Sequence, residues 1–136
     1  MSVYVPAALA KFVRQRAGNQ CEYCRLPQDA QEAAFHIDHI KPRWARGPTT
    51  AANLALACVT CSLRKGARTR VRDPESNQMV PLFHPRRHRW DEHFLLTEHK
   101  RVVGVSTMGR ATINALAMNR PALVAIRRAL SLLRPE

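Results

Sequence analysis

The sequence predicts an α+β fold, and three observations lead to that prediction. Two short segments with strand character lie in the middle of the chain, at residues 34–40 and 53–57. Apolar residues recur with helical spacing near both ends of the chain. Four cysteines form two Cys-x-x-Cys pairs that bracket the strand region. The length of 136 residues suits a single domain.

The first element expected along the chain is a helix over residues 6–17. Pro6 suits the first turn of a helix, where its missing N–H costs nothing. Gly18 followed by Asn19 is typical of a helix end. The apolar residues between these signals recur at i, i+3 and i+4, so one face of the helix can pack on a core.

The centre of the chain predicts a hairpin followed by a short helix. Residues 34–40 alternate apolar and polar side chains and stop before Pro42, as expected of a strand that runs into a loop. Residues 53–57 predict the returning strand, and residues 59–68 predict a short helix rich in Arg and Lys. The turn-forming cluster at residues 73–77 predicts the tip of a second hairpin.

The C-terminal part predicts one further strand and two helices. Residues 83–94 form an irregular basic segment, and residues 101–105 predict a strand. Residues 108–118 and 122–133 have helical apolar spacing and are separated by a segment containing Pro121. These two helices are expected to cover the sheet.

The charge balance indicates a polyanionic partner. Lys and Arg number 22 against 10 acidic residues, which gives a formal net charge of +12. So many positive charges repel one another in a compact fold, which favours a polyanionic partner. Nucleic acid is the leading candidate, because each phosphate that the protein neutralises releases counterions and so adds affinity. A generally basic protein without such a partner is the alternative, and the clustering of the basic residues argues against it.

No targeting or membrane segment is expected. The basic residues follow the short apolar stretch at residues 3–10, which is the wrong order for a secretory signal. No apolar run approaches the roughly eighteen residues of a membrane span. We therefore expect a cytoplasmic protein, in whose reducing surroundings cysteines bind metal more often than they form disulfides.

The two cysteine pairs predict a structural zinc site. Each Cys-x-x-Cys spacing lets two thiolates converge on one ion, and 33 residues separate the pairs, enough for the expected hairpin. An all-thiolate site has no open position, so this zinc should stabilise the fold and take no part in catalysis. Redox-active thiols are the alternative, and they would oxidise readily and carry no zinc. The predicted ligands are Cys21, Cys24, Cys58 and Cys61.

Asp38 and His39 form a candidate hydrolytic pair. They are adjacent at the end of the first expected strand, so their side chains diverge. A carboxylate is a natural ligand of a hard divalent cation, and histidine supplies a base with a pKa near neutrality. Hydrolysis of a phosphodiester needs both functions.

The order of these residues resembles the HNH endonucleases. The resemblance rests on Asp38-His39-Ile40, Asn53-Leu54 and residues 58–66, which interleave with the two cysteine pairs in the family's order. It covers about residues 20–68 and implies a ββα-metal core with a structural zinc, here between an N-terminal helix and a C-terminal hairpin plus two helices. On this resemblance, residues 20–68 are the core and residues 69–136 are a C-terminal extension of the same domain. It further implies a metal-dependent endonuclease that hydrolyses DNA phosphodiester bonds by a one-metal mechanism.

The resemblance also implies roles for individual residues. His39 corresponds to the general base, and Asn53 to the residue whose amide holds the loop around it. Asp38 corresponds to a ligand of catalytic Mg²⁺ or Mn²⁺, and His36 to a further ligand or a supporting group. The family usually has His or Asn as a second ligand where this chain has Ser62, whose hydroxyl is a poorer ligand and also suits a helix N-cap.

Double-stranded DNA is the partner that the resemblance implies. Contacts to phosphate carry no sequence information, so we expect low sequence preference. The alternative is a zinc-stabilised nucleic-acid-binding module that has lost or weakened catalysis, and Ser62 is the residue that raises it. The candidate phosphate contacts are Lys41, Arg43, Arg64, Lys65 and Arg68.

Overall fold

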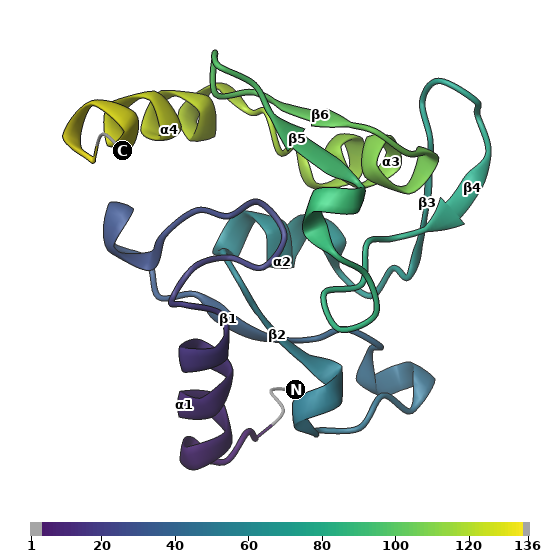
Figure 1. Cartoon of the computed structure of the whole chain (residues 1–136). Coiled ribbons are helices and arrows are strands. Elements are labelled where there is room, and N and C mark those ends of the chain that lie inside the picture. The colour runs from purple at the N-terminus through teal and green to yellow at the C-terminus, as the bar shows by residue number, and fades with distance from the viewer. Residues whose placement is uncertain (1–3, 135–136) are drawn as a thin grey trace. The chain divides into compact units, whose positions relative to one another are not determined.

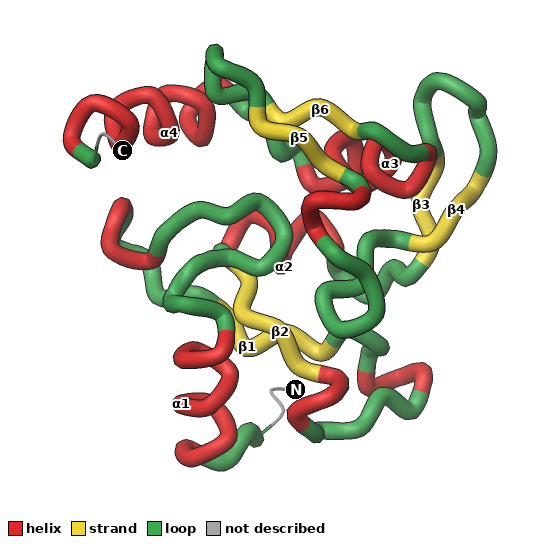
Figure 2. The backbone as a smooth tube through the Cα atoms, in the orientation of Figure 1, coloured by secondary structure: helices red, strands yellow, loops and turns green. Residues whose placement is uncertain are grey.

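The chain divides into two compact units, Met1–Ala67 and Arg68–Glu136. The computed structural model describes residues 4–134. Within them it contains four α-helices and three two-stranded antiparallel sheets, which confirms the α+β class (Figures 1 and 2). The break between the units lies next to the boundary expected between core and extension, and the single-domain assignment stays a prediction.

The first unit is built on one hairpin with a helix before it and a helix after it. β1 pairs with β2 so that His36 faces Ala57 and His39 faces Leu54. All four residues of β2 are buried, because this strand lies at the centre of the unit. In chain order the elements are α1 (Ala7–Arg16), β1 (His36–His39), β2 (Leu54–Ala57) and α2 (Val59–Lys65).

The hairpin is joined to the segments that precede it by specific hydrogen bonds. Arg16, the last residue of α1, donates to the carbonyl oxygens of Ala51 at 2.9 Å and Leu54 at 2.7 Å. The Glu22 backbone N–H donates to the Leu56 carbonyl oxygen at 2.8 Å, and the Glu22 carboxylate accepts a hydrogen bond from the Leu56 N–H at 2.8 Å. These bonds hold the first cysteine pair beside β2.

The short helix α2 is defined at both ends by local chemistry. The Cys58 sulfur accepts a hydrogen bond from the Cys61 backbone N–H and so caps the first turn. Gly66 follows the last helical residue with φ of +55°, a conformation that favours glycine. The helix therefore ends three residues earlier than the expected Arg68, because Gly66 leaves the helical conformation.

The second unit contains two hairpins and two helices. Helix α3 packs against β6 and against the hairpin of β3 and β4. A side chain at Gly109 would collide with the His93 carbonyl oxygen, which explains why glycine occupies this position of α3. The elements are β3 (Arg70–Arg72), β4 (Met79–Pro81), β5 (Phe94–Leu96), β6 (Val102–Gly104), α3 (Thr107–Leu116) and α4 (Pro121–Leu133).

The extension differs from the sequence expectation by one strand. Residues 73–77 do form the tip of a hairpin, and strand β6 lies within the expected residues 101–105. However, β5 begins at Phe94, the last residue of the segment expected to be irregular, and pairs with β6. The extension therefore holds two hairpins where one was expected. None of the helices within residues 4–134 combines the length and apolar character that crossing a membrane demands.

A buried carboxylate organises the tip of the β3–β4 hairpin. Asp73 is fully buried and accepts hydrogen bonds from Arg110 at 2.9 and 3.2 Å and from the Ser76 hydroxyl at 2.7 Å. Arg110 also pairs with Glu75 at 3.1 Å. The Arg110 guanidinium holds the pKa of Asp73 well below its usual range.

The Asp73 ion pair predicts an acid-dependent loss of stability. Because the folded pKa lies below the unfolded value of about 3.9, the pair stabilises fully above that pH and loses its effect as the pH falls below it. We expect Asp73→Asn to lower the melting temperature by several degrees at pH 7. The difference in melting temperature between the variant and the wild type should become smaller below about pH 4. Thermal melts across pH test this, with the exposed Glu98→Gln as control. A gap that stays constant with pH would contradict it.

Candidate functional site

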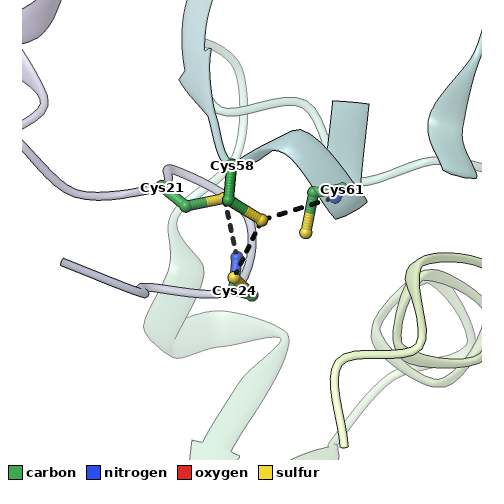
Figure 3. A group of neighbouring side chains, drawn as sticks. All are labelled: Cys21, Cys24, Cys58 and Cys61. Carbon is green, nitrogen blue, oxygen red and sulfur yellow. Dashed lines mark hydrogen bonds between the residues drawn. The ribbon is translucent and has the colours of Figure 1, made fainter. Parts of the chain in front are cut away.

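Four buried cysteines converge in the first unit. Cys21 and Cys24 lie in the turn after α1, and Cys58 and Cys61 lie at the start of α2. Their sulfur atoms all lie within 4.8 Å of one another, and the side chains face a common centre in Figure 3. The backbone N–H groups of Cys24 and Cys61 each point at the sulfur of the preceding cysteine in their pair, at 3.4 Å.

The donor set and its dimensions fit a zinc ion. Four thiolates bound tetrahedrally at about 2.3 Å place neighbouring sulfurs about 3.8 Å apart. The Cys24 and Cys58 sulfurs are 3.7 Å apart. Burial raises the pKa of the Cys21 thiol well above its usual range, so charged thiolates at this density require a cation. The cluster is thus a possible zinc site, formed by the residues that the sequence spacing predicted.

A surface pocket of about 310 Å³ lies beside β1. It is lined by β1, by the start of the loop that follows it, and by one side of α2 with its exit. The pocket collects five residues that the sequence analysis predicted for the site: His36, Asp38, His39, Arg43 and Ser62.

The Asp38 carboxylate borders this pocket and is held in place by contacts with two buried side chains. Its side chain is 10% exposed, and its Oδ2 atom pairs with the Lys65 ammonium at 3.1 Å. The buried Tyr23 hydroxyl donates to the same oxygen at 3.4 Å. Burial raises the pKa of Asp38, and the adjacent Lys65 ammonium acts in the opposite direction.

His39 borders the same pocket from the end of β1. Its Nε2 atom lies 2.9 Å from the Thr49 hydroxyl, which fixes the orientation of the ring. Partial burial lowers the pKa of His39, and the nearby Arg43 acts in the same direction. The imidazole is therefore neutral near pH 7 and can accept a proton.

Asn53 holds the loop that separates β1 from β2. Its side chain accepts the Lys41 N–H at 2.8 Å and donates to the carbonyl oxygens of Lys41 at 3.0 Å and Pro48 at 2.9 Å. A Cβ atom at Gly47 would overlap the Lys41 carbonyl, so the loop also depends on glycine at this point. The loop that carries Thr49 is thereby fixed at both ends.

His36 and Ser62 are hydrogen-bonded to each other at the wall of the pocket. The His36 Nδ1 atom lies 2.8 Å from the Ser62 hydroxyl, and one residue comes from β1 and the other from α2. His36 lies on the same side of β1 as Asp38, since residues two apart in a strand share a face, and Ser62 contacts His36 from α2. Together with Asp38 they form the donor set available to a divalent cation.

The predicted DNA contacts fall into three different situations. Lys41, Arg43 and Arg64 are exposed on the first unit, and Arg68 is exposed on the second. Lys65 differs from expectation. It is buried, and its amine also donates to the His39 carbonyl at 3.0 Å, so it does not face a DNA strand. The contacts from Lys65 to Asp38 and His39 explain this burial.

The sequence analysis missed two residues next to the site. Tyr23 lies inside the first Cys-x-x-Cys pair, and a large aromatic side chain within such a turn is the one available signal of its packing. Thr49 lies in the connecting loop and had no signal at all. Its contact with His39 spans ten residues and depends on how the loop folds back.

Comparison with known proteins agrees with the resemblance noted above. The HNH endonuclease family model matches residues 21–68, which span both cysteine pairs and the residues of the pocket. The chain is 26% identical over 146 residues to the Septu protein PtuA of Bacillus mycoides (strain KBAB4). That alignment covers 88% of this chain and 20% of the relative, so the chain spans about a fifth of the relative's length. No solved structure matches the chain.

Proposed function

From the match of residues 21–68 to the HNH endonucleases, we propose that this chain is a metal-dependent DNA endonuclease. The observation that supports the proposal is the surface pocket bordered by both Asp38 and His39. The proposed mechanism uses one metal ion. In it, the His39 imidazole acts as the general base that takes a proton from the attacking water.

Three residues are proposed to hold the catalytic cation. Asp38 supplies a carboxylate oxygen, and His36 and Ser62 supply the further donors on the same pocket wall. Bound Mg²⁺ or Mn²⁺ would neutralise the charge that develops on the scissile phosphate. Asn53 is proposed to support His39 indirectly, through the loop that positions Thr49.

A structural zinc and a DNA-binding surface complete the proposal. The cysteines Cys21, Cys24, Cys58 and Cys61 would bind zinc as four thiolates. The partner would be double-stranded DNA, contacted through its phosphates with low sequence preference. Of the basic residues, we propose Lys41, Arg43, Arg64 and Arg68 as contacts, and we leave out Lys65 because it is buried.

The second candidate function is a zinc-stabilised nucleic-acid-binding module without catalysis. The hydrogen bond between His36 and Ser62 favours it, because these two side chains satisfy each other and Asp38 is then the one strong ligand on this wall. A neutral hydroxyl also binds a divalent cation more weakly than a second carboxylate or an imidazole.

Cleavage of supercoiled plasmid separates the two candidates. We expect the zinc-loaded protein to nick the plasmid when Mg²⁺ or Mn²⁺ is supplied and not when both are omitted. The cation should be omitted and not chelated, since a chelator would also remove zinc. A protein that retards the same DNA in a gel but never nicks it with either ion would support the binding module.

A further inference from the structure

Lys65 occupies a position that lysine rarely takes. It is the last residue of α2 and is 1% exposed, although lysine is almost never fully buried unless it is paired. Its amine lies 3.1 Å from Asp38 Oδ2 and 3.0 Å from the His39 carbonyl oxygen. One ammonium group thus contacts both Asp38 and His39, two of the residues that border the pocket. A buried ion pair is seldom the most stable way to fill such a space, so its place beside the pocket calls for another explanation.

The two oxygen atoms of Asp38 have different surroundings. Lys65 and Tyr23 both contact Oδ2, at 3.1 and 3.4 Å. Both contacts fall on this one oxygen, and the carboxylate borders the pocket. The carboxylate therefore has one oxygen committed to the protein and one that remains for a cation.

We propose that Lys65 is a positioning residue that makes Asp38 a one-oxygen ligand and thereby selects a small divalent cation. The inference rests on the proposed function, since it concerns the same cation site. Mg²⁺ and Mn²⁺ accept single carboxylate oxygens and complete an octahedral shell with water. Ca²⁺ gains more from a carboxylate that can turn and bind through both oxygens. Tyr23 assists Lys65 because its hydroxyl contacts the same oxygen.

Competition between Mn²⁺ and Ca²⁺ tests this proposal without DNA. Mn²⁺ binding to the zinc-loaded full chain is followed by the electron paramagnetic resonance of free Mn²⁺, and Ca²⁺ is then added as a competitor. We expect Lys65→Met to reduce the preference for Mn²⁺ over Ca²⁺ by about tenfold or more, as loss of one charged hydrogen bond typically does. Tyr23→Phe removes only a hydroxyl and should reduce the preference in the same direction by about threefold.

Two further variants make the outcome decisive. Lys11→Met removes the same charge from an exposed position on α1 and should leave the preference unchanged. If Lys65→Met fails to fold, Tyr23→Phe decides alone. An unchanged Mn²⁺ preference in the folded variants overturns the role of Lys65. By contrast, Mn²⁺ binding that is absent from wild type, or that Asp38→Asn does not weaken, overturns the proposed cation site itself.

Discussion

Replacing His39 with alanine is expected to reduce plasmid nicking by about a hundredfold to ten-thousandfold, the range that a general base typically contributes. The reason is local, because His39 is the imidazole at the pocket whose ring is oriented by Thr49 at 2.9 Å. Removal of the ring leaves Asp38 and its neighbours in place, so retardation of DNA in a gel should be retained. Initial nicking rates at saturating Mn²⁺ measure the effect.

An exposed histidine of the second unit serves as the matched control. His99 has an exposed side chain and lies outside the pocket, so His99→Ala should nick at the wild-type rate. Equal nicking by His39→Ala and wild type would contradict the assignment of His39 as the base. If wild type and His39→Ala were both inert while both still bound DNA, the binding module would be the better description.

Removing the zinc ligands is expected to unfold the first unit. Structural zinc in small domains contributes about 10–16 kcal/mol of apparent binding free energy, which is as large as the whole stability of a typical domain, about 5–15 kcal/mol. Cys58→Ser removes one thiolate, while the serine hydroxyl can still cap α2, so the substitution tests the zinc ligand itself. Zinc content, circular dichroism and hydrogen exchange measure the outcome, and protection should be lost in β1, β2 and α2.

The control for the cysteine substitution lies within the same turn. Thr60→Ala changes a residue between Cys58 and Cys61 without removing a ligand, so zinc binding and exchange protection should persist. A wild-type protein that contains no zinc, together with a Cys58→Ser variant that keeps the same protection, would show that the cluster has no structural role. Redox-active thiols would then be the better interpretation.

Most of the first unit could be predicted from local sequence signals. The expected helix at residues 6–17 agrees with α1 to within one residue at each end, because a proline marks its start and a glycine follows its end. The hairpin was predicted from the alternation and apolar character of two short segments, and the cysteine cluster from the spacing within each Cys-x-x-Cys pair; these are local patterns. Roles for Asp38 and His39 needed the order of motifs along the chain, since a single histidine next to an aspartate carries little information.

The features that the sequence did not predict depend on contacts between distant residues. Lys65 was expected on a surface because basic residues at a helix end usually face water. Its burial follows from Asp38 and His39, each more than twenty residues away. Strand β5 was missed for a similar reason. Its three residues show no alternation of their own, and β6 defines them by pairing.

Helix α2 connects the cysteine cluster to the pocket over a very short distance. It has seven residues, and helices shorter than about twelve residues are marginal on their own. Cys61 lies near its start and Lys65 at its end, so a zinc ion that ordered the helix would also place the amine next to Asp38. On the proposed function, a newly synthesised chain would be an inactive precursor until it is metallated. Zinc supply would then control when the cell is exposed to the nuclease.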